Sequence, residues 1–409
     1  MSAIKSLIVG VAIASSLSAA RADDARFVSW AYSEAPGRAF ISSQIRDIPG
    51  VNVELIGFPF KNTLENLILR YRSGQPTEAA QIQERWLPTL AKMGALKDLN
   101  GVIGQDALNL VDPSLLATGQ VDGKQYAVPW TAGSIAMVAN KVVLDKAGIK
   151  QMPRTMQEFG DDLRAIKAAV PNSVPFGLST SNPEFIQVES QIIFWQFGAH
   201  FFQDEKVAVD SEQSRKALQF IVDLVKDGLV AKGNDRFATR NLFAQELVGF
   251  YFDAPVARGF ARKLTGQGPD YDKNVIVMPT PLTDSGQPPR SVIWAHLLGI
   301  MNGGDPNVAA GAKIISHFAL DPNTQEAYWN ALGLFPTTKA AISWFGKDAY
   351  VTNWIGLTKT ALFDEPAAFA NSAEISNIIG EEIQSAMLGL KTVDQAIADM
   401  AKRLTQATQ

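Results

Sequence analysis

The segment VDGKQYAVPWTAGSIAMVAN, residues 121–140, gives the most direct prediction of how the chain is organised. Asp122-Gly123 favours a tight turn, and Pro129 ends the short strand predicted after it, because proline lacks a backbone N–H. A loop is predicted over 130–134, followed by an apolar strand over 135–139. Two arrangements fit this pattern: a crossing between two domains with Trp130 and Thr131 beside a cleft, or a hairpin within one sheet.

The length and composition predict a globular protein of two domains. The chain has 409 residues, more than a single hydrophobic core usually serves, and is 46% hydrophobic and 19% charged. Its net charge is −4 without any block of basic residues, which argues against a nucleic-acid partner. It contains no Cys, and its three His, at 200, 296 and 317, lack the spacing of a zinc site. We therefore expect neither a metal nor a cofactor.

Residues 1–22 have the pattern of a secretory signal peptide. Lys5 precedes an apolar run over 7–14, and Ala20-Arg21-Ala22 has the small-x-small form of a cleavage site. Neither this run nor a later one is long enough to span a bilayer. The alternative is a frayed first helix. We expect cleavage after Ala22 and a mature chain in the periplasm.

Strands and helices alternate along the first hundred residues, which predicts an α/β fold with a mostly parallel sheet. Strands are expected over 26–32, 51–56 and 79–83, with helices over 38–46 and 62–72. Ligands of such sheets bind at the carboxyl ends of the strands. The loops at 32–34 and 83–86 are therefore candidate ligand loops.

Later segments carry helix-start signals. Thr155 and Glu158 have the spacing of a capping box. Asp305-Pro306 and Asp321-Pro322 each predict a helix that begins with an aspartate cap and a proline at its first position. The last hundred residues are expected to be mainly helical.

A series of short motifs resembles those of the large carbohydrate-binding family of extracellular solute-binding proteins, the periplasmic receptors of ABC importers, of the maltodextrin-binding type. The motifs are YRSGQP (71–76), LAKMGAL (90–96), DGKQYAVP (122–129), NK (140–141), AG (147–148), PRT (153–155), GLFP (333–336) and TVDQA (392–396). Their order and spacing along nearly the whole mature chain carry the resemblance.

The resemblance implies two α/β lobes that close on a ligand about a hinge with several crossings, near 128–131, 294–298 and 336–345. The amino-terminal lobe would comprise residues 23–129 and 295–337, and the other lobe residues 130–294 and 338–409. It also implies a monomeric receptor, not an enzyme, that delivers a sugar or oligosaccharide to a membrane permease.

A sugar site needs aromatic rings against the C–H faces of the sugar and polar groups for its hydroxyls. Aromatic candidates at predicted strand ends, crossings or helix ends are Trp30, Tyr32, Trp86, Trp130, Trp195, Trp294 and Phe335. Polar candidates are Glu34, Glu84, Arg85, Thr131, Asp253 and His296. The alternatives are core packing for the aromatic residues, a solvated surface for the carboxylates and a hinge hydrogen bond for His296. Val256 and Gly133 depart from the family, where an aromatic and an acidic residue are expected.

Two other functions stay open at this point. The same fold serves other polar solutes, such as a polyol; Glu34, Glu84 and Asp253 would suit a polyamine, and Arg85 a phosphorylated polyol. Glu84 and Asp253 would also serve as the paired carboxylates of an exported glycoside hydrolase. Against a hydrolase, the chain has no catalytic motif and no eightfold strand–helix repeat.

Overall fold

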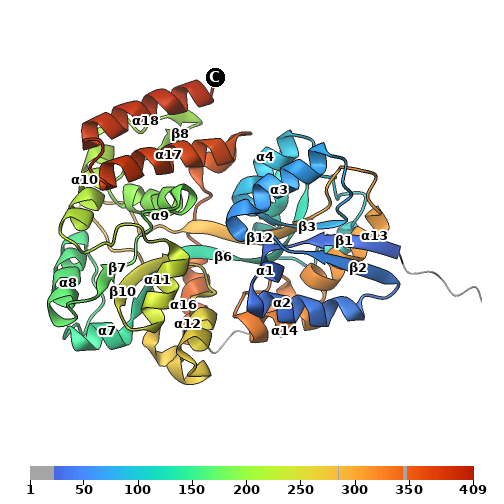
Figure 1. Cartoon of the computed structure of the whole chain (residues 1–409), viewed down its shortest axis with the longest axis horizontal. Coiled ribbons are helices and arrows are strands. Elements are labelled where there is room, and N and C mark those ends of the chain that lie inside the picture. Colours follow the sequence, from blue (N-terminus) through green and yellow to red (C-terminus); the bar gives the residue numbers. More distant parts are fainter. Residues whose placement is uncertain (1–22, 284, 344–347) are drawn as a thin grey trace, which may run out of the picture.

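The protein is described by a computed structural model that covers residues 23–283, 285–343 and 348–409. The predicted signal peptide over 1–22, and the end of the third predicted crossing at 344–345, lie outside the described residues. Figure 1 shows two α/β lobes, with strands β6 and β12 running between them. The predicted two-lobed α/β fold is confirmed.

The strands form one large sheet and two small hairpins. The sheet contains β1 (Asp23–Val28), β2 (Val51–Ile56), β3 (Ala79–Gln83), β6 (Ala127–Asn140), β7 (Val174–Phe176), β10 (Val248–Asp253), β11 (Val275–Met278) and β12 (Val292–Gly299). The hairpins are β4 (Gln120–Val121) with β5 (Lys124–Gln125), and β8 (Phe202–Gln203) with β9 (Lys206–Val207).

Helices cover the sheet in both lobes. In the amino-terminal half these are α1 (Trp30–Ser33), α2 (Ala35–Gln44), α3 (Phe60–Arg72), α4 (Leu87–Lys92), α5 (Gln105–Leu108), α6 (Pro113–Leu116), α7 (Lys141–Lys146), α8 (Met156–Ala169) and α9 (Pro183–Gln196). In the carboxy-terminal half they are α10 (Glu212–Lys226), α11 (Arg236–Ala244), α12 (Ala257–Thr265), α13 (Val308–Ile315), α14 (Pro322–Leu332), α15 (Lys339–Ile342), α16 (Ala349–Thr358), α17 (Ser372–Met387) and α18 (Val393–Ala407).

The sheet is mixed, so the prediction of a mostly parallel sheet was wrong for its centre. Its order is β2-β1-β3-β12-β6-β10-β7, with β11 also paired to β6. The outer strands pair in parallel, β1 with β2 and β3, and β10 with β7. Strands β6 and β12 pass between the lobes in opposite directions, so they pair antiparallel with each other and with their neighbours.

Strand β6 is continuous, which corrects the predicted loop over 130–134. All of its residues are buried. Residues 127–135 lie along β12, and residues 136–140 lie along β10 and β11. The segment therefore crosses from one lobe to the other and does not form a hairpin. The lobe boundaries proposed from the sequence stay a prediction.

A β-bulge accounts for the proline inside this strand. The register between β6 and β12 shifts between His296 and Leu297, which leaves Trp130 as an extra residue on the β6 side. Proline is tolerated at bulges because the hydrogen-bond ladder is interrupted there. Pro129 therefore adjoins the bulge instead of ending the strand.

The bulge residue Trp130 lies in the hydrophobic core. Its side chain is fully buried. Its ring stacks on that of Tyr328 in α14, with centroids 4.4 Å apart and planes 7° apart. Phe318 meets the same indole edge-on at 5.4 Å, and Phe27 of β1 lies at 6.2 Å. The indole thus joins the crossing strand to the first strand and to a carboxy-terminal helix.

The first strand is shorter than predicted. β1 ends at Val28, and Trp30–Ser33 form one helical turn, so Tyr32 does not lie on a strand. Ser29, just before this turn, donates its hydroxyl to Gln81 Oε1 of β3 at 2.5 Å. This bond fixes the start of the turn against the sheet.

The helix-start predictions have different outcomes. Asp321 caps α14, as expected, and Gly333 ends that helix with a φ of 69°. The prediction at Asp305-Pro306 was wrong, because Asp305 has a φ of 53° and Asn307 provides the cap of α13. No helix in the described part of the chain is long and apolar enough to cross a bilayer.

Only half of the predicted capping box forms at the start of α8. Thr155 Oγ1 accepts the backbone N–H of Glu158 at 3.1 Å. The Glu158 carboxylate accepts the backbone N–H of Arg154 at 2.7 Å instead of that of Thr155.

We expect Trp130→Ala to lower the free energy of unfolding by about 3–5 kcal/mol, because it leaves a cavity beneath Tyr328. Leu69→Ala is the control, since Leu69 is 63% exposed and its truncation is expected to cost under about 0.5 kcal/mol. Urea unfolding measures both. A loss below about 1 kcal/mol for Trp130→Ala would contradict the core position of the indole.

Candidate functional site

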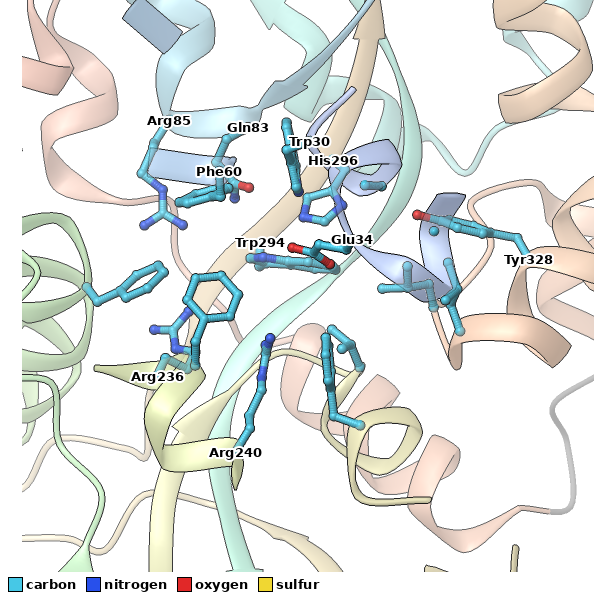
Figure 2. A pocket seen from close by; sticks show the side chains of 18 residues that line it. Trp30, Glu34, Phe60, Gln83, Arg85, Arg236, Arg240, Trp294, His296 and Tyr328 are labelled. Atoms are coloured by element: carbon cyan, nitrogen blue, oxygen red, sulfur yellow. The ribbon is translucent and has the colours of Figure 1, made fainter. Parts of the chain in front are cut away.

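A cavity lies between the two lobes beside the crossing strand β12 (Figure 2). Its empty space, including the mouth, is about 750 Å³. The amino-terminal segments contribute Trp30, Ala31, Glu34, Gly37, Phe60, Gln83 and Arg85. The opposite wall consists of Phe185, Arg236, Phe237, Arg240, Val256 and Phe260, and the remaining lining is Trp294, His296, Tyr328, Leu332 and Leu334.

Two residues of β12 form one side of the cavity. Trp294 and His296 are two positions apart on the strand, so their side chains project from the same face of the sheet. Their ring centroids are 4.3 Å apart. Trp30 of α1 meets the imidazole of His296 edge-on, with a centroid distance of 4.7 Å and an interplanar angle of 83°. The three rings form a largely apolar surface whose polar groups are the imidazole and the two indole N–H groups.

Aromatic rings also meet across the cleft. Phe60 at the start of α3 stacks on Phe185 of α9, with centroids 5.8 Å apart and planes 19° apart. The ring of Phe237 in α11 lies 6.3 Å from that of Phe60. Trp86 lies behind Trp30 and Phe60, with ring distances of 5.4 and 5.1 Å, and is 3% exposed. The two lobes are therefore in contact at this side of the cavity.

Two arginines enter the cavity from one face of α11. Asp235 caps this helix, and Arg236 and Arg240 follow four residues apart, so they lie on the same face. Arg236 Nε donates to Glu189 Oε1 at 3.0 Å. Arg240 donates to both carboxylate oxygens of Asp253, at 2.8 and 2.5 Å. Both carboxylates are fully buried, so they fix the guanidinium groups and offset their charge.

Arg85 is the third arginine, and it lies between two carboxylates. Its Nε is 3.6 Å from Glu84 Oε1 and 3.3 Å from Glu184 Oε1. Glu184 belongs to α9, so this ion pair joins the two lobes. Figure 2 shows the guanidinium of Arg85 directed toward the cavity.

Glu34 brings a carboxylate to the cavity from the junction of α1 and α2. Burial raises the pKa of this carboxyl, and the positive charges of Arg240 and Lys263 act in the opposite direction. Its side chain makes no hydrogen bond with another described residue. Glu34 is therefore available to accept hydrogen bonds from a ligand.

Five of the thirteen residues predicted for the site line the cavity: Trp30, Glu34, Arg85, Trp294 and His296. Trp86, Glu84 and Asp253 lie directly behind lining residues. Trp130, Thr131, Trp195, Phe335 and Tyr32 do not line it. Whether the five lining residues contact a ligand stays a prediction.

The predicted residues outside the cavity have structural contacts of their own. Trp130 and Thr131 are buried along β6. Trp195 donates its indole N–H to Glu365 Oε1 at 2.6 Å. Phe335 packs on Trp354, with ring centroids 6.4 Å apart.

Glu84 lies under β12 and not in the cavity. Its Oε2 accepts the backbone N–H of Ala295 at 2.9 Å, and the amide of Gln83 also donates to it. Burial raises the pKa of Glu84 to about 7, although the positive charge of Arg85 acts in the opposite direction. The carboxyl of Glu84 therefore holds the crossing strand.

The sequence interpretation missed the wall formed by α11 and α12, above all Arg236, Phe237, Arg240 and Phe260. These residues supply the aromatic surface that was expected at Val256, which itself lines the cavity. Arg240 lies over the ring of Phe260, 4.2 Å from its centroid. Two arginines four residues apart around Phe237 lie on one helix face, but an exposed face has the same pattern, so no sequence signal marked this wall. Phe60 was also missed, although it follows a strand that was predicted correctly.

The described residues include no group of three or more acidic or His side chains placed to hold a metal ion.

We expect Asp253→Ala to lower the free energy of unfolding by about 3–5 kcal/mol, because it leaves the buried charge of Arg240 without its partner. Asp394→Ala is the matched control: it removes an ion pair with Arg215 in which the aspartate is 81% exposed, and we expect a loss under about 1 kcal/mol. Urea unfolding compares them. Equal losses would contradict the burial of the Arg240 pair.

We expect Glu84→Gln to become relatively more stable than the parent as pH rises from 4.5 to 7. The folded carboxyl keeps its proton up to a pKa of about 7, whereas the unfolded one ionises near 4.5, so the parent loses stability as pH rises through this window. The gain would be on the order of 3 kcal/mol. Thermal unfolding at several pH values tests it, with the exposed Glu54→Gln as control. A difference between variant and parent that does not change with pH would contradict the raised pKa.

Comparisons with known proteins identify the family of the chain and proteins with a similar sequence or fold. The family model of bacterial extracellular solute-binding proteins matches residues 47–357. A binding protein of Brucella abortus is 25% identical over 408 residues, covering 97% of this chain and 96% of that protein. The sn-glycerol-3-phosphate-binding periplasmic protein of Salmonella typhimurium is 22% identical over 371 residues, covering 85% of this chain and 83% of that protein.

A solved structure has the same fold. The ABC transporter solute-binding protein of Thermotoga lettingae, bound with α-D-tagatose, superposes with a TM-score of 0.85 at 20% identity, covering 95% of this chain and all of that one. The family model covers well over half of the chain. The chain therefore belongs to the family of bacterial extracellular solute-binding proteins.

Proposed function

We propose that this protein is the receptor of an ABC importer, that it works outside the cytoplasmic membrane, and that it binds an uncharged sugar between its lobes without altering it chemically. The observation that carries the proposal is an aromatic cavity in which each arginine is already paired with a carboxylate. The tagatose-bound relative from Thermotoga lettingae supports a sugar as the ligand class.

The aromatic surfaces suit the C–H faces of a sugar ring. Trp30 and Trp294 lie on the side of β12, and Phe237 and Phe260 lie on the opposite wall. Rings on two sides allow a flat, polyhydroxylated ligand to be held between them. The phenylalanine rings have no hydrogen-bonding groups, so polar contacts must come from the other lining side chains. These are the charged residues, the imidazole, Gln83, Tyr328 and the two tryptophans with their indole N–H groups.

The charge balance favours an uncharged ligand over an anion. Arg236 and Arg240 are each bonded to a fully buried carboxylate, and Arg85 Nε lies 3.3 Å from the carboxylate of Glu184. In these arginine–carboxylate pairs the guanidinium N–H groups are oriented and can donate to hydroxyl groups of a ligand. The carboxylates leave little unbalanced positive charge in the cavity. A phosphate dianion would require that charge, because its removal from water is costly. The lining carboxylate is Glu34 alone among the described residues, which also disfavours a polyamine.

The arrangement does not favour a glycoside hydrolase. Glu84 is hydrogen-bonded to the backbone of β12, and Asp253 is bonded to Arg240. Neither lines the cavity, and a hydrolase needs two carboxyl groups on opposite sides of the scissile bond. The remaining alternative is a polyol phosphate, which the relative from Salmonella typhimurium is named for.

Closure of the lobes would enclose the ligand. The Phe60–Phe185 stack and the Arg85–Glu184 ion pair both join the lobes beside the cavity. A ligand that contacts both walls stabilises this closed arrangement because it binds the open one less tightly. The closed form would then present one surface to the permease.

The test is thermal unfolding of residues 23–409 with uncharged mono- and oligosaccharides, sugar phosphates, polyol phosphates and polyamines. A ligand of the folded state adds RT ln(1 + [L]/Kd), about 2.7 kcal/mol at a hundredfold excess over Kd. We expect stabilisation by an uncharged sugar. Stabilisation by a phosphorylated compound alone would overturn the uncharged ligand, and cleavage of an oligosaccharide would overturn the assignment as a receptor.

Phe237→Ala and Phe363→Ala form a matched pair for locating the site. Both side chains are at least one-third exposed, but only Phe237 lines the cavity. We expect Phe237→Ala to weaken sugar binding about three- to tenfold and Phe363→Ala to leave it unchanged. Calorimetric titration measures both. Equal affinities in the two variants would place the sugar elsewhere.

A further inference from the structure

A buried glutamine connects the first helical turn to the imidazole of the cavity. Gln81 lies in β3 and is fully buried. Its Oε1 accepts the hydroxyl of Ser29 at 2.5 Å and the backbone N–H of Ala31 at 3.2 Å. Its Nε2 lies 3.2 Å from Nδ1 of His296. The amide thus lies between the segment that carries Trp30 and the strand that carries His296.

The orientation of this amide follows from its backbone partner. The backbone N–H of Ala31 is only a donor, so the atom that faces it must be the oxygen of Gln81. The NH₂ group of Gln81 then faces His296, and it is only a donor as well. Nδ1 of His296 must therefore accept, which requires it to carry no proton. In a neutral imidazole the proton then resides on Nε2.

We propose that Gln81 is a positioning residue that fixes His296 as the tautomer protonated on Nε2, so that the cavity presents one permanent N–H donor to an oxygen of the ligand. The inference rests on the proposed function for the nature of the ligand. The tautomer itself follows from the hydrogen-bond chain from Ala31 through Gln81 to His296.

The position of the imidazole agrees with this role. Figure 2 shows His296 beside Trp30 and close to Trp294 at the cavity. Its Nδ1 is turned to the sheet, and Nε2 has no hydrogen-bond partner among the described residues. A donor at this place bonds a hydroxyl or ring oxygen of a sugar, whereas an ammonium group, which offers only donors, finds no acceptor there.

The surroundings keep the imidazole neutral. Burial, together with the positive charges of Arg85 and Arg240, lowers the pKa of His296 to about 3. The other charged groups that line the cavity are Arg236 and the carboxylate of Glu34. The side chains opposite His296 on the adjoining strands, Gln83 and Thr131, are uncharged. Sugar affinity should therefore not depend on the titration of His296 between pH 4.5 and 8.

The first test needs no ligand. In residues 23–409 labelled with ¹⁵N-histidine, His296 is one of only three histidines, and the variants His200→Gln and His317→Gln assign the other two. We expect the ¹⁵N shifts of His296 to show Nε2 protonated and Nδ1 unprotonated, unchanged from pH 8 to 4.5. A proton on Nδ1, or titration near pH 6.5, would overturn the proposal.

The second test changes the partner of Nδ1. In Gln81→Glu the carboxylate accepts from Ser29 and Ala31 and also from Nδ1, so the proton moves to Nδ1 and the pKa of His296 rises. Sugar affinity would fall about tenfold at pH 8, where Nε2 is unprotonated, and recover at lower pH as the imidazolium regains its Nε2–H. A loss of affinity that does not recover at low pH would indicate a merely structural role and overturn the proposal.

Gln81→Met covers the case in which the glutamate variant does not fold. Its side chain has a similar length and makes no strong hydrogen bond to Nδ1. We expect the ¹⁵N shifts of His296 to become an average of both tautomers, and unchanged shifts would overturn the role of Gln81. If the parent shows the Nε2–H tautomer but binds no sugar, the proposed function fails and the tautomer assignment stands.

Discussion

The antiparallel pairing of β6 with β12 is the interaction on which the rest of the structure depends. It is the place where the sheet of one lobe continues into the sheet of the other. The same pairing places Trp294 and His296 at the cavity. The residue at its bulge, Trp130, is buried in the core, where its indole stacks on Tyr328. This pair of strands therefore joins the two lobes and supplies part of the cavity lining. Through Trp130 it also packs against α14.

Most charged and polar side chains that line the cavity already have a hydrogen-bond or ion-pair partner within the protein. Asp253 and Glu189 lie fully buried behind the guanidinium groups that reach the cavity. Gln81 is also fully buried, and it lies behind the imidazole of His296. Arg236, Arg240 and His296 are each held in one orientation by a partner that does not itself line the cavity. Such preorganisation lowers the cost of ordering side chains when a ligand binds.

The sequence predicted the elements whose signal is local and missed those whose position depends on how the lobes pack. β2 and β3 have the predicted bounds, because short apolar runs between turn signals are sufficient evidence for strands. The loop predicted around Trp130 was wrong, because a bulge lets Pro129 stay in the strand, and bulges depend on the partner strand.

The residues of the candidate site show the same difference between local signals and lobe packing. Trp294 and His296 were found because they lie on a crossing strand, and Trp30 and Glu34 because they follow a strand end. Arg236 and Arg240 were missed because an exposed helix face and a cavity-lining face have the same pattern of residues. Glu84 and Arg85 are adjacent in sequence, yet one holds the backbone of β12 and the other reaches the cavity. Only the packing of the second lobe distinguishes them.

The contacts between the lobes also have a kinetic consequence. If lobe closure encloses the ligand as proposed, the Phe60–Phe185 stack and the Arg85–Glu184 pair have to separate before it can leave. Its residence time is then limited by the opening rate of the protein as well as by the strength of its own contacts. Where opening is slower than dissociation from the open form, two ligands of different affinity would leave at similar rates. Their difference in affinity would then appear as a difference in the fraction of time that the lobes stay closed.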